Sequence, residues 1–344
     1  IFVATISDVA KKASVSKSTV SRVLNGIPVK EENRQKVLNA MQALGYQPNA
    51  QARSLTLGKT DVVGVLVPNM DGPFYGSILE GCQQALWSHG LYMIVRSTHH
   101  DRGSEPNLVK LLWEKRVDGL IIFTPREIKE RPMQALVKDL VASNFPLVVA
   151  DGELDSLSIS GVWIDNFEGG YKATKHLINL EHQKIGILLG PDDSPESKLR
   201  LNGYKRALKD HALPFDQELV ASAGDYRSGS AQRIFSQLVD AGATAIFACS
   251  DELAYGVMEA CKERGISIPQ DLSLIGYDDV PFARLTTPKL TTVAQPLGQL
   301  GQVAAGRIAR MISGEEREVT QITLPTKLVV RETTGPYQGK SSSH

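Results

Sequence analysis

The 344-residue sequence lacks the features that mark secreted and membrane proteins. It has three cysteines, Cys82, Cys249 and Cys261, and none forms a Cys-x-x-Cys pair, so we expect reduced structural thiols. No apolar run approaches the ~18 residues that a membrane-spanning helix needs. No signal-peptide pattern is present. Together these absences predict a cytoplasmic protein that does not associate with membranes.

Motifs of several enzyme classes are also missing. The first predicted strand is not followed by Gly-x-Gly-x-x-Gly, and the sequence has no P-loop and no Gly-x-Ser-x-Gly. Asp151, Asp278 and Asp279 could in principle serve as acid–base groups. His99-His100-Asp101 suggests a metal site, but no third ligand is evident. We therefore expect a binding protein rather than an enzyme, with neither a metal nor a cofactor.

The net charge of the chain is zero, but its distribution is uneven. Residues 1–60 contain nine Lys and Arg against three Asp and Glu, a net charge of +6, and the rest of the chain carries −6. A basic amino-terminal module on an acidic body is typical of a protein that contacts nucleic acid through one end.

Residues 5–26 have the pattern of two short helices joined by a tight turn. Thr5 and Asp8 predict a capping box at the start of the first helix, which continues with apolar residues at helical spacing. Ser14-Val15-Ser16 then interrupts the run, and Ser16 can cap a second helix. This arrangement is that of a helix-turn-helix.

The second helix separates apolar from polar side chains. Val20, Val23 and Leu24 are expected to face inward, which leaves short polar and basic side chains on the outer face. Such a face suits base edges and phosphates in a major groove, and the alternative is an ordinary amphipathic hairpin of helices. The DNA contacts expected here are Thr5, Ser16, Lys17, Ser18, Thr19, Ser21, Arg22 and Asn25.

A third helix, expected over Glu31 to Leu44 with Val37, Leu38, Met41 and Leu44 on one face, is followed by Tyr46-Gln47-Pro48-Asn49. With these motifs the chain resembles the LacI/GalR family of bacterial transcriptional regulators over nearly its full length. The resemblance implies a hinge helix that folds when two subunits meet on DNA and whose leucine enters the minor groove. It adds Tyr46, Asn49, Ala52 and Leu55 to the expected DNA contacts.

One departure from the family pattern concerns the turn. Relatives often have glycine where Ser14 stands, because the turn can need a permissive backbone. Serine is a mild substitution and leaves the interpretation unchanged. The resulting organisation is a headpiece over residues 1–46, a hinge and linker over 47–60, and a body over 61–344.

The body alternates short apolar runs with amphipathic helical stretches, which predicts parallel doubly wound sheets. Two such sets are divided near Gly161. The family resemblance implies a fold like that of periplasmic binding proteins, with the chain crossing between two subdomains near residues 161, 292 and 323. The amino subdomain would then hold residues 61–161 and 293–322, and the carboxy subdomain 162–292 and 323–335, including a last strand over Leu324–Arg331.

Ligands of open α/β sheets bind beyond the carboxyl ends of the strands, so the loops there are expected to form the site. The resemblance implies that Arg200, in Arg-x-x-Gly-Tyr, forks to two ligand oxygens and that Asp278 accepts ligand hydroxyls. Asp165-Asn166 and Asp251 are expected to serve as loop and helix caps, and Ser250 replaces a common asparagine. The candidates for effector binding are Asp71, Phe74, Tyr75, Asp151, Arg200, Ser250, Asp278 and Gln295.

These observations favour a repressor that binds double-stranded operator DNA as a homodimer and responds to a sugar or sugar derivative. No heptad pattern follows Arg331, so a dimer is the default. The alternative is a sugar-binding receptor without a gene-regulatory role, which would leave residues 1–60 unexplained. A sugar-metabolising enzyme with an accessory module is a third hypothesis. The sequence leaves open whether the effector releases the protein from DNA or promotes binding.

Overall fold

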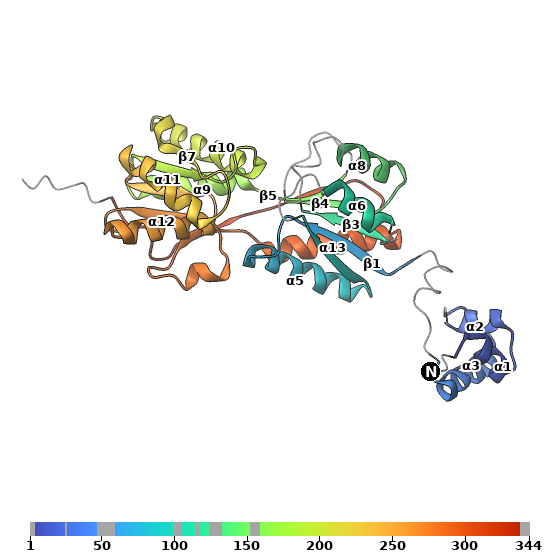
Figure 1. Cartoon of the computed structure of the whole chain (residues 1–344). Helices are drawn as coiled ribbons and strands as arrows, with labels where there is room; N and C mark the ends of the chain where they lie inside the picture. The colour runs from blue at the N-terminus through green and yellow to red at the C-terminus, as the bar shows by residue number, and fades with distance from the viewer. Residues whose placement is uncertain are drawn as a thin grey trace, which may run out of the picture. The chain divides into compact units, whose positions relative to one another are not determined.

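The computed structural model describes residues 4–24, 26–46, 59–98, 105–114, 117–123, 133–151 and 159–337. The chain divides into two compact units, residues 1–60 and 61–344 (Figure 1). The first unit contains the headpiece, residues 1–46, and the second is the body. Several residues named above lie outside the described ranges: Asn25, Asn49, Ala52, Leu55, His99, His100 and Asp101.

The headpiece consists of three helices, α1 (Ile6–Ala13), α2 (Lys17–Leu24) and α3 (Glu31–Leu44). The predicted capping box is present, since Thr5 N donates to Asp8 Oδ2 at 2.9 Å and Asp8 N donates to Thr5 Oγ1 at 3.4 Å. Ser16 accepts from Thr19 N at 3.1 Å and so caps α2 as expected. The small core of this unit is formed by Val9, Ala10, Ala13, Val20, Val37 and Ala40.

Two details of the headpiece bear on the sequence-based expectations. Ser14 ends α1 in the left-handed region, at φ 54° and ψ 41°, which is where a glycine would be least strained. Leu38 was expected on the inner face of α3, but it is 42% exposed. Ala40 is buried in its place, because α3 presents the Val37–Ala40 face to α1 and α2.

The first subdomain of the body is a six-stranded sheet in the order β11-β5-β4-β3-β1-β2, with every adjacent pair parallel. Its strands are β1 (Val62–Val67), β2 (Tyr92–Ser97), β3 (Gly119–Ile122), β4 (Leu147–Ala150), β5 (Ser160–Ile164) and β11 (Gln321–Leu324). The helices that accompany it are α5 (Pro73–Ser88), α6 (Glu105–Glu114), α8 (Met133–Ala142) and α13 (Leu297–Ser313). Separate apolar clusters join α5 and α13, and α6 and α8, to the sheet, as in a doubly wound fold.

The second subdomain repeats this plan with the strand order β12-β10-β9-β8-β6-β7. Its strands are β6 (Ile185–Leu189), β7 (Val220–Ser222), β8 (Ala245–Ala248), β9 (Ser273–Asp278), β10 (Thr291–Ala294) and β12 (Lys327–Val329). Its helices are α9 (Asn166–Asn179), α10 (Pro195–Asp210), α11 (Ser228–Asp240) and α12 (Asp251–Arg264), with short 3-10 turns η1 (Gln217–Leu219) and η2 (Pro281–Arg284). Only β12 runs antiparallel to its neighbour, β10.

The strands place the crossings between the sheets a few residues later than expected. β5 belongs to the first sheet as far as Ile164, β10 to the second as far as Ala294, and β11 to the first as far as Leu324. Leu324, expected in the last strand of the second sheet, is therefore in the first. Gly161 does not mark a boundary: it lies inside β5, where a Cβ would come within 2.1 Å of the Trp163 ring.

In both subdomains, glycine allows neighbouring helices to come into backbone contact. In the first, a Cβ on Gly301 of α13 would lie 2.0 Å from the carbonyl oxygen of Ile78 in α5. In the second, a Cβ on Gly203 of α10 would lie 2.1 Å from the carbonyl oxygen of Phe167 in α9. Glycine is required at both contacts because any side chain would force the helices apart.

Within the described ranges, no helix combines the length and apolar content that crossing a bilayer requires.

Candidate functional site

The outer face of α2 carries the polar residues expected to contact DNA. Lys17, Ser18 and Arg22 are exposed. The hydroxyl of Ser16 lies 2.8 Å from those of both Ser18 and Thr19, so these three side chains form one hydrogen-bonded group. The face therefore offers two cations beside a group of fixed hydroxyls, a composition suited to phosphates and base edges.

Two of the other expected DNA contacts, Thr5 and Tyr46, have structural roles in the headpiece. Thr5 forms the capping box of α1, and its hydroxyl also donates to Asp8 at 2.7 Å. Tyr46 is half-buried and packs against the headpiece core. Ser21 is half-buried on α2. Lys17, Ser18 and Arg22 are exposed and have no such structural role in the headpiece core.

Arg200 lies in α10 and is only 4% exposed. Its Nε donates to Asn166 Oδ1 at 2.9 Å, and its Nη1 donates to the carbonyl oxygen of Cys249. The guanidinium carbon is 3.7 Å from the centre of the Tyr277 ring. Contacts with α9, the end of β8 and β9 thus hold a buried cation in one orientation.

The close approach of α9 to α10 accounts for the position of Arg200. A Cβ on Gly170 would lie 2.3 Å from the carbonyl oxygen of Arg200, and one on Gly169 would lie 2.1 Å from the Tyr277 hydroxyl. With Gly203 facing α9 from the other helix, the pair of helices brings Asn166 within hydrogen-bonding distance of the guanidinium. The glycine of the Arg-x-x-Gly-Tyr pattern is therefore a packing requirement of this site.

Asp278 ends β9 near Arg200 and is 9% exposed. Gln295 Nε2 donates to Asp278 Oδ1 at 2.6 Å. Burial raises the pKa of Asp278 to about 7, although Arg200 and the hydrogen bond from Gln295 act to lower it. Asp278 and the following Asp279 both have positive φ, 117° and 56°, so this turn is strained for residues other than glycine.

Ser250, and not Asp251, caps the helix that follows β8. Ser250 caps α12, accepting from Leu253 N at 3.1 Å. Asp251 is fully buried and accepts from Val280 N at 2.9 Å and from the Thr292 hydroxyl, so it braces the turn after Asp278 rather than capping the helix. Burial, and repulsion from Asp278, raise the pKa of Asp251.

Two further residues differ from expectation in what they bind. Asp165 caps α9 as expected, accepting from Glu168 N at 2.9 Å, but its neighbour Asn166 holds Arg200 instead of capping. Asp279 pairs with Arg331, so this carboxylate is not available for a ligand. The contact between Tyr277 and Arg200 was not predicted from the sequence. An aromatic residue in a buried strand looks like an ordinary core residue in the sequence, so nothing indicated that it stacks on a cation.

The remaining candidates lie beyond the carboxyl ends of strands in the first subdomain. Asp71 is exposed in the loop after β1, and Phe74 and Tyr75 begin α5 as a half-buried, edge-to-face pair with ring centroids 5.0 Å apart. Asp151 follows β4, is 8% exposed and has φ 63°. Arg200, Asp278 and Gln295 come together at the corresponding edge of the second sheet.

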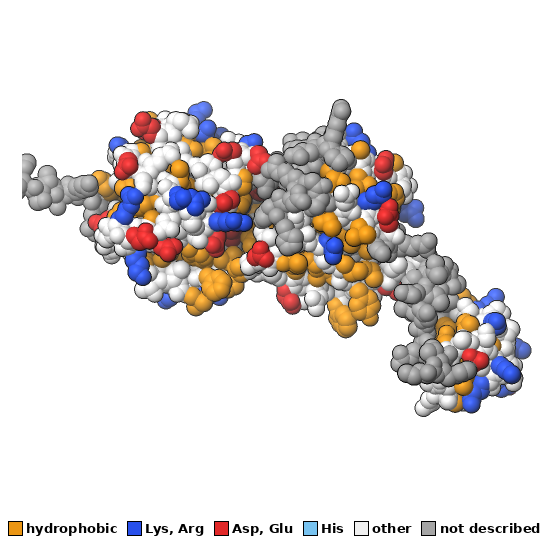
Figure 2. All heavy atoms as spheres, in the orientation of Figure 1, with side chains coloured by type: hydrophobic (Ala, Val, Ile, Leu, Met, Phe, Trp, Pro, Cys, Tyr) orange, Lys and Arg blue, Asp and Glu red, His pale blue; other side chains and the backbone are white. Residues whose placement is uncertain are grey.

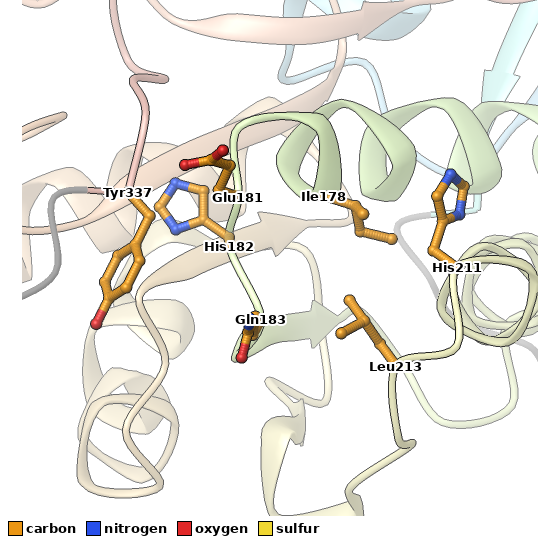
Figure 3. Close-up of a pocket in the computed structure, with 7 residues that line it drawn as sticks. All are labelled: Ile178, Glu181, His182, Gln183, His211, Leu213 and Tyr337. Carbon is orange, nitrogen blue, oxygen red and sulfur yellow. The ribbon is translucent and has the colours of Figure 1, made fainter.

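A separate hollow lies at the opposite edge of the second sheet (Figure 3). Its lining is Ile178, Glu181, His182, Gln183, His211, Leu213 and Tyr337. His182 precedes β6, and its ring nitrogens lie 3.0 Å from the hydroxyls of Thr244 and Ser273. Its side chain therefore links the starts of β6, β8 and β9. This position is remote from the carboxyl ends of the strands, where ligands bind. Within the described part of the chain, no three potential metal ligands lie together.

Comparisons with known proteins match both units. Residues 5–49 match the model of bacterial regulatory proteins of the lacI family, and residues 174–334 match that of a periplasmic binding protein-like domain. The transcriptional regulator DegA of Bacillus subtilis is 34% identical over 334 residues, which is 96% of this chain and 98% of DegA. The chain belongs to the LacI family of bacterial regulatory proteins. This confirms the family drawn from the sequence.

Solved structures of LacI-family proteins agree in fold. The lac repressor dimer bound to operator and the anti-inducer ONPF is 29% identical, with a TM-score of 0.83, covering 97% of this chain and all of that one. A LacI-family regulator from Enterococcus faecium with bound ribose is 31% identical, with a TM-score of 0.72, covering 80% of this chain and all of that one. The predicted helical headpiece and pair of parallel-sheet subdomains are confirmed.

Proposed function

We propose that this LacI-family protein is a sequence-specific transcriptional repressor that binds operator DNA as a homodimer and is controlled by a sugar or sugar derivative. The observation that carries the proposal is the presence, in one chain, of the polar face of α2 and the buried Arg200–Asp278 pair. DegA, which matches nearly the whole chain, is named a transcriptional regulator. We further propose a cytoplasmic location, where chromosomal DNA is accessible.

The DNA contacts are assigned to α2 and the segment that follows the headpiece. Lys17, Ser18 and Arg22 face base edges in this proposal, and Thr19 and Ser21 contact phosphates. From the segment that follows, Tyr46, Asn49, Ala52 and Leu55 are proposed as further contacts, with Leu55 of each subunit entering the central minor groove. Support comes from the lac repressor dimer, a similar structure that is bound to operator.

The effector is assigned to the cleft between the two subdomains of the body. Arg200 offers N–H donors, while Asp278 and Gln295 offer acceptors, and vicinal hydroxyls satisfy both kinds of group. Phe74 and Tyr75 supply the flat apolar surface that one face of a sugar ring accepts. The ribose bound to the Enterococcus faecium relative supports a sugar.

Regulation requires the effector to distinguish two states of the body. A ligand that binds the DNA-competent and DNA-incompetent states equally changes nothing, however tightly it binds. We propose that the effector changes the arrangement of the two subdomains and with it the spacing of the two headpieces. Operator and effector then alter each other's affinity by the same factor.

Exposed apolar side chains support a homodimer. On the first subdomain, Trp87, Tyr92 and Ile94 are 71%, 61% and 45% exposed, and the last two lie on the edge strand β2. On the second, Leu285 and Phe282 are 71% and 55% exposed. Hydrophobic side chains gather along the edge of the body on which α5 lies (Figure 2). Apolar patches on an edge strand are typical of surfaces that pair with another chain.

The test combines two measurements on the full chain. A thermal-shift panel of ribose, other sugars, sugar phosphates, glycosides and purines identifies the compound that stabilises the body by mass action. Binding to DNA selected from a random library is then measured at several salt concentrations with and without that compound. Salt-dependent, sequence-specific binding that the compound changes supports a regulator. Sugar binding without specific DNA binding would favour the receptor alternative, and turnover of the sugar would favour an enzyme.

A further inference from the structure

Asn166 connects the buried cation of the second subdomain to the first crossing between the sheets. Its side chain is buried, at 3% exposed. Its Oδ1 accepts from Arg200 Nε at 2.9 Å, and its Nδ2 donates to the carbonyl oxygen of Ile164 at 3.3 Å. Ile164 is the last residue of β5, and Asn166 is the first of α9. One short side chain thus bridges the candidate effector site and the end of a strand in the other sheet.

The end of β5 is in turn joined to the third crossing. Ile164 pairs with Leu324 of β11, and Asp165 N donates to the carbonyl oxygen of Leu324 at 3.0 Å. Beyond Leu324, the carbonyl oxygen of Thr326 accepts from Lys172 Nζ at 3.0 Å. A displacement of the Ile164 carbonyl is therefore shared by two of the three segments that connect the subdomains.

Helix capping does not account for the side chain of Asn166. The cap of α9 is supplied by Asp165, which accepts from Glu168 N at 2.9 Å. Burying an amide side chain is unfavourable unless both its oxygen and its nitrogen form hydrogen bonds. In Asn166 the oxygen accepts from Arg200 and the nitrogen donates to Ile164. Alanine at position 166 would leave the cap intact and would remove only this connection.

We propose that Asn166 is a positioning residue that couples the guanidinium of Arg200 to the crossings, so that effector contact at Arg200 alters the arrangement of the subdomains. The inference rests on the proposed function, in which Arg200 contacts the effector. Because the amide has only two rotatable bonds and is held at both ends, a shift of the guanidinium is passed to the β5–α9 segment rather than absorbed. Gln295, which directly follows β10, also donates to Asp278 of the candidate site, but only its Nε2 is used.

The test separates the two hydrogen bonds of Asn166. N166D keeps an acceptor for Arg200 Nε but loses the donor to Ile164, whereas N166A loses both. N202A, an exposed amide on α10, is the matched control. For each full-length variant, the affinity for ribose, or for the panel sugar that shifts the wild type most, is measured by calorimetry. Operator affinity is measured with and without that sugar at saturation.

N166D is expected to bind the sugar within about threefold of wild type and to lose about fivefold in the factor by which the sugar changes operator affinity. N166A is expected to lose both, and N202A neither. Amide hydrogen exchange at Asp165, measured without any sugar, is expected to be faster in N166D than in N202A. Wild-type coupling in N166D, or unchanged exchange at Asp165, overturns the proposal. If the wild type binds none of the panel sugars, or binds no specific DNA, the proposed function is overturned, and with it the role of Asn166.

Discussion

Gln295 donates a 2.6 Å hydrogen bond to Asp278, while its own side-chain oxygen, Oε1, is buried and has no hydrogen-bond partner among the residues that the structure describes. An unpartnered buried acceptor beside a buried carboxylate is unfavourable until something donates to both. A ligand with two adjacent hydroxyls provides those donors. In the proposed effector site this arrangement would favour a neutral polyhydroxy ligand over an anion, which Asp278 repels when it is ionised.

Sugar affinity is expected to rise with pH through neutrality. Asp278 has a pKa of about 7, raised by burial, and a hydroxyl donates better to the ionised carboxylate. Protons are therefore released on binding near pH 7, and calorimetry between pH 6 and 8 in buffers of different ionisation enthalpy measures them. D278N should remove the dependence. A pH-independent affinity in the wild type would contradict this assignment of Asp278.

The raised pKa of Asp278 also makes the stability of the folded chain depend on pH. Asp278 has a higher pKa in the folded chain than in the unfolded one, so its protonated form favours folding. The contribution is fully present below about pH 4, the usual value for an aspartate, and is lost as pH rises through about 7. D278N is expected to flatten this part of the pH profile of the melting temperature.

Arg22→Ala is expected to weaken operator binding at least tenfold and to leave sugar binding unchanged. Arg22 is an exposed cation on the outer face of α2, where it can reach a base or a phosphate. Arg34→Ala, which removes an exposed arginine from α3, is the control. Filter binding or fluorescence anisotropy with selected DNA gives both values. Equal operator affinity in the two variants would exclude α2 as the recognition helix.

Arg200→Ala should retain operator binding but lose its response to the sugar. The guanidinium is held by Asn166 and Cys249, so its position is fixed before a ligand arrives. Arg200→Lys keeps the charge but not the planar fork, and is expected to restore little of the response. Operator titrations with and without the sugar measure this. An undiminished response in Arg200→Ala would remove this residue from the effector site.

Ser14→Gly is expected to stabilise the headpiece by about 1 kcal/mol, because Ser14 occupies the left-handed region. Gly45→Ala is the matched opposite: Gly45 ends α3 at φ 57°, and a Cβ there meets nothing within 4 Å, so only backbone strain changes. Hydrogen exchange of the headpiece amides reports the local stability of each variant. If Ser14→Gly proves destabilising, the turn does not hold serine under strain.

Gly203→Ala is expected to destabilise the second subdomain by about 1–3 kcal/mol and to lower sugar affinity. The added Cβ would lie 2.1 Å from the carbonyl oxygen of Phe167, so α10 must move together with Arg200. Gly229→Ala in α11, where nothing lies within 4 Å, is the control. Urea unfolding followed by far-ultraviolet circular dichroism, with calorimetric sugar titrations, distinguishes them. A Gly203→Ala protein that matches the control would show that the contact between the two helices yields easily.

Long periodic segments could be predicted from the sequence, and short ones could not. β1 and β4 are continuous apolar runs, as expected of parallel strands that are buried on both faces. β7, with three residues, gives too short a run to be distinguished from a loop. β11, with the sequence Gln-Ile-Thr-Leu, alternates polar and apolar residues over only four positions, and its partner β5 lies 160 residues earlier in the sequence.

The site shows a similar limit. Arg200 and Asp278 were predicted from the family resemblance and Gln295 was a further candidate, and the structure brings the three together. Local sequence could not decide between Ser250 and Asp251 as the cap of α12, since both residue types cap helices well. Asp251 is instead bonded to Val280 and Thr292, which lie 29 and 41 residues away. Which of two adjacent residues caps a helix is therefore decided by partners that are distant in the sequence.

The third crossing has a consequence for synthesis of the protein. Residues 321–329 supply β11 to one sheet and β12 to the other, and each is the outermost strand of its sheet. A chain emerging from the ribosome can therefore complete the first subdomain only after Leu324 has been translated, and the second only after Val329. By contrast, the three helices that the structure describes in the headpiece lie within the first 46 residues. Nascent chains would carry a finished DNA-binding unit long before they carry a body able to restrain it.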